Sequence, residues 1–179
     1  MATIAKNILT NYHRRISGGK VLLGPELAEF IESPVMMLFA TRDEAGRPMI
    51  GRGSGVRFGR QSGHLHFLAS RCQWPKAVGE ARAGRPIATT YVRAADYKAC
   101  QIKGRVLEAG PADAACRALG QAYVAEQLAR MLALGVTRMQ LSSTLSDQEL
   151  VCLTIEPQEV FEQTPGPGAG RRLIPETVA

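Results

Sequence analysis

Aromatic residues and runs of basic residues are scarce in this sequence. Phe, Trp and Tyr make up only 6% of the 179 residues, although 22 Lys and Arg against 16 Asp and Glu give a net charge of +6. Proteins that bind single-stranded nucleic acid usually combine a basic groove with aromatic side chains that stack on bases. Because the cations here are scattered, we expect no nucleic-acid partner, and the positive charge favours a small anionic ligand instead.

Long apolar runs and paired cysteines are also lacking. No window approaches the roughly 18 apolar residues of a membrane span, and polar residues interrupt the N-terminal stretch, unlike in a secretory signal. The four cysteines show no Cys-x-x-Cys spacing, so neither a metal site nor a disulfide framework is expected. These absences predict a cytoplasmic protein with reduced cysteines and no membrane partner.

The length fits a single domain with a sizeable core, covering residues 1–179. Residues 1–24 are weakly patterned and are interpreted as an N-terminal extension, in which residues 4–12 could form a short helix. Residues 163–179 are a Pro/Gly-rich C-terminal tail whose first part, up to Gly170, cannot be regular structure. No internal repeat or linker divides the chain.

Most of the remaining chain shows strand patterns separated by turn residues. Helices are expected from Pro25 to a stop at Ser33-Pro34, over 75–82, and from about 112 to a cap at Gly135. Expected strands cover 35–41, 48–58, 64–69, 87–92, 97–107 and 150–155, and the last of them could continue to 161. The apolar run 35–41 suggests burial on both faces, and 136–148 is ambiguous.

Two successive hairpins, with turns near Gly46 and Gly63, indicate an antiparallel meander rather than a parallel sheet. A closed barrel is the best arrangement for so many antiparallel strands, since it leaves no exposed edges. The prediction is a mainly β protein, a six-stranded antiparallel barrel with flanking helices.

One stretch of this predicted barrel gathers cations around a hairpin and a helix start. Arg52, Arg57 and Lys76 could converge on one anion, and a phosphate is held best by several charge-assisted donors and a helix N-terminus. Arg57 follows Arg52 by five positions, an odd offset that would send them to opposite faces of a strand. A bend or bulge at the intervening glycines, Gly53 and Gly55, would bring them to one face.

The order of these elements resembles the FMN-binding split barrel of the pyridoxamine 5'-phosphate oxidase-like superfamily, over roughly residues 25–161. The similarity rests on the first helix, the strand 35–41, the turn from Asp43 to Pro48, the strand pair that follows it, and the segment Gln101–Val106. The resemblance implies FMN as cofactor and a homodimer with the flavin between its subunits. The flavin-binding residues that it implies are Arg52, Gly53, Ser54, Gly55, Val56, Arg57, Phe67, Leu68, Lys76 and Gln101.

The C-terminal part departs from the vitamin B6 oxidases of that superfamily. Those enzymes carry a Trp-Gln-Gly and an Arg-Leu-x-x-Arg segment for their substrate, whereas this chain has Phe161-Glu162-Gln163 and Arg171-Arg172-Leu173. The Trp and the second Arg are missing, so we do not expect pyridoxamine phosphate oxidation.

The resulting hypothesis is an FMN-dependent oxidoreductase that takes electrons from a nicotinamide cofactor or another small organic donor. Lys103 or Arg105 would stabilise the reduced flavin. Two alternatives stay open: a non-catalytic flavin carrier or sensor, and a barrel that binds haem or a deazaflavin, with His64 or His66 as the haem-related candidates.

Overall fold

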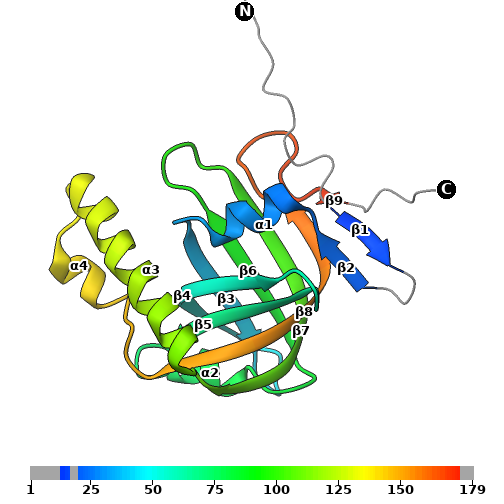
Figure 1. Cartoon of the computed structure of the whole chain (residues 1–179), viewed down its shortest axis with the longest axis horizontal. Helices are drawn as coiled ribbons and strands as arrows, with labels where there is room; N and C mark the ends of the chain where they lie inside the picture. The colour runs from blue at the N-terminus through cyan, green and yellow to red at the C-terminus, as the bar shows by residue number, and fades with distance from the viewer. Residues whose placement is uncertain (1–12, 17–19, 174–179) are drawn as a thin grey trace, which may run out of the picture.

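The computed structural model describes residues 13–16 and 20–173 (Figure 1). The helix expected within residues 4–12 lies outside this range. The strands are β1 (His13–Ile16), β2 (Lys20–Leu23), β3 (Met36–Arg42), β4 (Pro48–Gly59), β5 (His64–Ser70), β6 (Pro86–Val92), β7 (Ala99–Pro111), β8 (Leu150–Glu162) and β9 (Arg172–Leu173). The helices are α1 (Pro25–Glu32), α2 (Pro75–Glu80), α3 (Ala114–Ala133) and α4 (Arg138–Ser142).

Six strands close into an antiparallel barrel. Their order is β5-β4-β3-β6-β7-β8, and β5 pairs with β8 to close the ring. This arrangement confirms the fold predicted from the sequence. The short strand β9 extends the sheet at β8, while β1 and β2 form a separate hairpin that the sequence pattern did not predict.

Alternating side chains of the six strands fill the barrel. Phe67 lies at the centre of an aromatic row, with ring centroids 5.7 Å from Phe39 and 6.5 Å from Tyr91, and all three side chains are buried. Edge-to-face contacts of this kind add to the free energy gained from apolar burial alone. The barrel interior is therefore packed by side chains and is not a ligand cavity.

Strand β3 differs from its expected burial. Met37 and Phe39 face the core and are almost fully buried, whereas Met36, Leu38 and Ala40 are only half-buried. The prediction of burial on both faces is wrong for this chain on its own, because the helices cover other parts of the barrel. The outer face of β3 is apolar and partly open.

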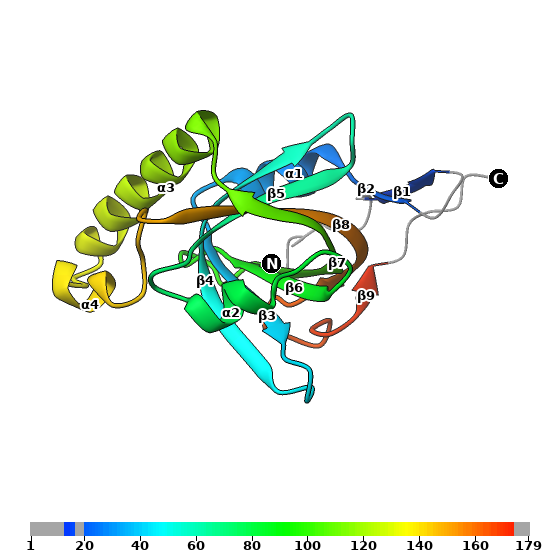
Figure 2. The same cartoon turned by 90° about the horizontal axis from the view of Figure 1, so that it is seen from below.

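The helices cover the two ends and one flank of the barrel (Figures 1 and 2). Helix α1 packs Leu27 and Ile31 into the core at one end, and Pro25 starts it as expected. Helix α2 lies at the other end, where the Thr41 hydroxyl donates to the Ala77 carbonyl at 3.0 Å. Helix α3 crosses the outside of the barrel and leads into α4.

The ambiguous segment 136–148 contains α4 and the connection to β8. Gly135, at φ +83°, follows α3 as expected from its sequence position. Thr137 then caps α4 through a reciprocal capping box with Gln140. Among the helices of the described residues, none combines the length and the apolar character that a membrane crossing requires.

Candidate functional site

A β-bulge in β4 determines which way the two arginines point. Gly53 pairs with Ala69 and Gly55 with Leu68, so one extra residue is accommodated between these pairs. Gly55 has a φ of +140°, a conformation that residues with a Cβ rarely adopt. This bulge confirms the expectation from the glycine pattern, and it turns residues 52 and 57 to the same outer face.

Helix α3 crosses β4 at this bulge. Gly120 of α3 lies against the Ser54 carbonyl and Gly55, and a Cβ at Gly120 would come within 2.5 Å of the Leu150 side chain. A larger residue there would force the tip of the Leu150 side chain to move, so glycine permits the closest approach of the helix to the sheet. The bulge and Gly120 together let α3 lie directly on the barrel.

The crossing helix separates the two arginines. Burial raises the pKa of Tyr123 and of Cys116 on α3. The charge of Arg52 counteracts this rise for Tyr123, and the charge of Arg57 does so for Cys116, so each arginine lies near its own residue of α3. Cys116 precedes Tyr123 on α3 by about two turns, or roughly 10 Å. Arg57 is exposed, whereas Arg52 is only 8% exposed. The two cations thus share a face of the barrel but lie in different surroundings.

The Arg52 guanidinium is buried and only partly satisfied. Its Nη1 donates to the Thr144 hydroxyl at 3.2 Å, but its Nε and Nη2 are buried without a hydrogen-bond partner. Among the described residues no carboxylate forms an ion pair with it. Burial lowers the pKa of Arg52 from its usual value, because removal from water disfavours the charged form. A buried cation with unused donors is unfavourable unless an anion joins it, and a phosphate group fits this donor set.

The segment Ser142–Gln148, which we call the cover segment, is held on the barrel by side chains from β4, β5 and the loop after β5. Gln73 donates to the Ser142 carbonyl at 3.0 Å, Ser54 to the Ser146 carbonyl at 2.7 Å and Ser70 to the Gln148 carbonyl at 2.8 Å. Arg52 contacts the same segment through Thr144. The cover segment therefore closes the region around Arg52 by a small number of polar contacts.

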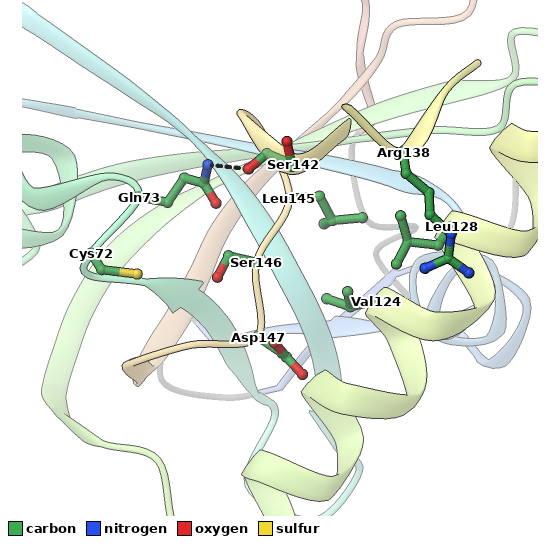
Figure 3. A pocket seen from close by; sticks show the side chains of 9 residues that line it. All are labelled: Cys72, Gln73, Val124, Leu128, Arg138, Ser142, Leu145, Ser146 and Asp147. Atoms are coloured by element: carbon green, nitrogen blue, oxygen red, sulfur yellow. Dashed lines mark hydrogen bonds between the residues drawn. The ribbon is translucent and has the colours of Figure 1, made fainter. Parts of the chain in front are cut away.

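A cavity of about 470 Å³ lies on the cover segment (Figure 3). Cys72 and Gln73 line one side and α3 the other, with the cover segment passing between them. The lining residues are Cys72, Gln73, Val124, Leu128, Arg138, Ser142, Leu145, Ser146 and Asp147. Since Thr144 lies between the lining residues Ser142 and Leu145, the cavity and Arg52 share the cover segment as a wall.

Gln101 lies in the same cross-strand row as Arg52. Arg52 pairs with Leu38, Leu38 with Thr90, and Thr90 with Gln101. Residues directly opposite one another in antiparallel strands point to the same face, and three strand spacings correspond to about 14 Å. The Gln101 amide also donates to the Thr90 hydroxyl at 3.1 Å, which fixes its orientation. Arg52 and Gln101 thus bound a half-buried strip of the outer barrel face.

The remaining predicted site residues lie elsewhere. Lys76 is exposed on α2, at the end of the barrel. Val56 and Phe67 are buried in the core, and Leu68 is fully buried beneath α3 with Leu150. The side chains of these three residues present no surface to a ligand here.

Sequence reasoning missed Thr144 and Tyr123. Tyr123 belongs to the predicted apolar stripe of α3, yet its hydroxyl donates to the Val35 carbonyl at 2.7 Å and lies near Arg52. Thr144 follows two serines in the ambiguous segment and carries no motif. Their proximity to Arg52 depends on where α3 crosses the barrel, and no local sequence signal specifies this position.

No known family model and no curated protein matches this sequence. The solved structures that are similar to the chain include three at 17% identity each. The first is a putative pyridoxamine 5'-phosphate oxidase from Lactobacillus delbrueckii, with a TM-score of 0.48 and coverage of 84% of this chain and 98% of that chain. The second is a pyridoxamine 5'-phosphate oxidase-related, FMN-binding protein from Nostoc punctiforme, with a TM-score of 0.43 and coverage of 75% of this chain and 77% of that chain. The third is the heme storage protein HutZ from Vibrio cholerae, with a TM-score of 0.40 and coverage of 79% of this chain and 94% of that chain. The chain's own strand pairing, a closed six-stranded antiparallel barrel, agrees with the split-barrel fold that the sequence resemblance implies.

Proposed function

We propose that this protein binds FMN on the outer face of the barrel, with the phosphate of FMN against Arg52. The observation that carries this proposal is the pair of buried, unpartnered guanidinium nitrogens, Nε and Nη2. These two atoms lie on one edge of the planar guanidinium group and can donate to two phosphate oxygens at once. The anion would also neutralise a cation that has no carboxylate partner among the described residues.

The strip between Arg52 and Gln101 is the proposed bed for the flavin ring. Leu38 and Thr90 lie between them in the same row and are half-buried. A planar, largely apolar ring system gains free energy by covering such a surface. The Gln101 amide, held by Thr90, offers both a donor and an acceptor to the polar edge of the ring.

The neighbouring cations Lys103 and Arg105 differ in their suitability as a partner for reduced flavin. Lys103 is exposed on the same face of β7 as Gln101, with its ammonium 4.4 Å from the Phe161 ring centroid. The Arg105 guanidinium donates to the Gly84 carbonyl at 2.6 Å and lies farther along the strand. We therefore assign to Lys103 the stabilisation of negative charge on the reduced ring.

A second copy of the chain is the proposed cover for this face. A ring bound on the outside of the barrel would keep one side in water unless another surface lies on it. Ile50 is 63% exposed and pairs with Ala40 in the row next to Arg52, which continues the apolar surface. Burial of this surface and of the flavin in a homodimer would remove both from water.

When bound, FMN supplies hydride and electron transfer. The chain positions the ring, holds the phosphate and excludes water from one side. We propose an oxidoreductase that receives electrons from a nicotinamide cofactor or another small organic donor. A non-catalytic flavin carrier would bind FMN equally well but would not be reduced by such a donor, so turnover distinguishes the two.

The visible absorption spectrum of the purified protein, before and after addition of FMN, tests the proposal. We expect flavin absorption bands that stay with the protein through gel filtration, at an elution volume corresponding to a dimer. Arg52→Met should lose the bound flavin, whereas the matched variant Arg57→Met, which changes an exposed arginine of the same strand, should keep it. A Soret band in place of flavin bands, or equal flavin binding by both variants, would overturn the assignment.

A further inference from the structure

Two of the four cysteines lie in contact across the interface between α3 and the barrel. Cys116 is the third residue of α3, and Cys152 lies on β8, 36 residues farther along the chain. Their sulfur atoms are 3.8 Å apart. Both are free thiols, and their sulfur atoms are in van der Waals contact, so a disulfide of about 2.05 Å requires the two side chains to move closer together.

The surroundings of the pair are apolar but not closed. Leu68, Ala112 and Leu150 form a small buried cluster against which both cysteines pack. Both cysteines are only half-buried, so a small oxidant can reach them from solvent. On β7, Gly110 stands opposite Cys152, and a Cβ at Gly110 would meet nothing within 4 Å, which leaves room for side-chain adjustment.

We propose that Cys116 and Cys152 are an oxidation site, at which a hydroperoxide converts the two thiols into a disulfide that fastens the first turn of α3 to β8. This inference is independent of the proposed flavin site. The sulfur of one cysteine, as thiolate, attacks the hydroperoxide and becomes a sulfenic acid, with release of water or an alcohol. The second sulfur then displaces the sulfenic oxygen as water. Two thiols lose two electrons and two protons in total, and the hydroperoxide is reduced.

Cys116 is the favoured site of the first attack. Burial raises the pKa of both thiols. For Cys116 the hydrogen bond to Cys152 counteracts this rise most, Asp113 adds to it, and Arg57 of β4 lowers the pKa by a smaller amount. The pKa of Cys152 is raised to about 12, mainly by burial, with Cys116, Asp113 and Glu108 of β7 adding to it. The pair therefore reacts slowly at neutral pH, because the thiolate is the nucleophile.

The other two cysteines offer matched controls. Cys100 is fully buried in the barrel, and burial raises its pKa strongly. Cys72 is exposed, with its sulfur 3.1 Å from the Ser70 hydroxyl. Neither is recorded in contact with another thiol among the described residues, so neither has a partner for an internal disulfide.

The test is thiol counting and peptide mapping on the full chain. The reduced protein is treated with hydrogen peroxide at mildly alkaline pH, denatured and alkylated with a maleimide, and its intact mass is measured. We expect at least two fewer adducts than in the untreated protein, since the exposed Cys72 can also be oxidised, and a cross-linked peptide that contains Cys116 and Cys152 in the monomeric chain. Cys72→Ser should form the same internal cross-link and lose two adducts, whereas Cys116→Ser and Cys152→Ser should form no internal cross-link.

Hydrogen exchange provides a second readout that needs no variant. Oxidation should slow amide exchange in the first two turns of α3, since the disulfide fixes them to β8. Retention of all four thiols, a cross-link that involves Cys72, or over-oxidation of a single cysteine without a cross-link would each overturn the proposal.

Discussion

Arg52 and Arg57 point to the same outer face of β4, although their offset of five positions is odd. The bulge between Gly53 and Gly55 adds the residue that restores their common direction. Helix α3 then passes over the bulge at Gly120 and leaves Arg52 buried and Arg57 exposed. The position of this one bulge thus decides which arginine can hold a ligand away from water.

Replacement of Gly55 by Ala should destabilise the protein and misalign the arginines. The φ of +140° at Gly55 is strained for any residue with a Cβ, and we expect a loss of about 1–3 kcal/mol in the free energy of unfolding. Gly79→Ala in α2, where a Cβ would meet nothing within 4 Å, is the control and should not be destabilised. Urea unfolding of both variants measures the difference, and equal stability would show that the bulge is not strained.

Replacement of Arg52 by Met should stabilise the ligand-free protein. The substitution keeps an unbranched apolar side chain but removes a buried cation with two unsatisfied donors. Exchange of buried charges for apolar groups of similar volume is often neutral or stabilising by about 1–4 kcal/mol. Without FMN, Arg52→Met should therefore show a higher urea midpoint than the wild type, with Arg57→Met within about 0.5 kcal/mol of it. A clear loss of stability in Arg52→Met would indicate that Arg52 serves the fold rather than a ligand.

Replacement of Ser54 by Ala should loosen the cover segment. The Ser54 hydroxyl is buried, and its bond to the Ser146 carbonyl is lost in the variant, at a cost of about 1 kcal/mol. We expect FMN to dissociate several times faster, as measured by stopped-flow fluorescence after dilution. Ser62→Ala, an exposed serine of the β4–β5 turn, should leave the rate unchanged. Equal FMN dissociation rates in the wild type and both variants would show that the cover segment does not affect FMN binding.

Disulfide formation between Cys116 and Cys152 should accelerate with pH beyond the range of an ordinary thiol. Burial raises the pKa of Cys116 above its usual value of 9.0, and thiolate therefore still accumulates as the pH rises past 9. The cross-linking rate in hydrogen peroxide, followed by mass spectrometry, should keep increasing there. A cross-linking rate that stops increasing below pH 9 would show that the pKa of Cys116 is not raised.

Once formed, the same disulfide should stabilise the fold. The disulfide would close a loop between residues 36 apart in sequence. Because this loop restricts the unfolded chain, it should raise the free energy of unfolding by at most about 4 kcal/mol. The oxidised protein should unfold at a higher temperature than the reduced one, and Cys152→Ser should show no such difference.

The fold could be predicted because its signals are local. Pro25 and Ser33-Pro34 delimit α1, and turns at Gly46 and Gly63 separate the strands of two hairpins. The paired glycines in β4 even indicated the bulge. In contrast, the strand expected over 97–107 ends too early, because β7 runs from Ala99 to Pro111 and pairs with β8 over that length.

The candidate site could be predicted only in part, because it depends on how distant elements pack. The sequence places Arg52, Arg57 and Lys76 close together in the chain, but α3 separates the first two, and Lys76 lies exposed on α2. The burial of Arg52 is caused by α3 and the cover segment, which come about 60 or more residues later. The common row of Arg52 and Gln101 likewise depends on the register of three strand pairs, β4–β3, β3–β6 and β6–β7.

Comparison of FMN with riboflavin, which lacks the phosphate, tests the central claim most directly. A charge-assisted contact contributes about 1.5–3 kcal/mol, so the wild-type protein should bind FMN roughly 10-fold to 150-fold more tightly than riboflavin. Titration calorimetry on the wild type, Arg52→Met and Arg57→Met gives the preference of each. We predict that Arg52→Met loses this preference and that Arg57→Met retains it. A preference for FMN that survives in Arg52→Met would contradict the assignment of the phosphate to Arg52.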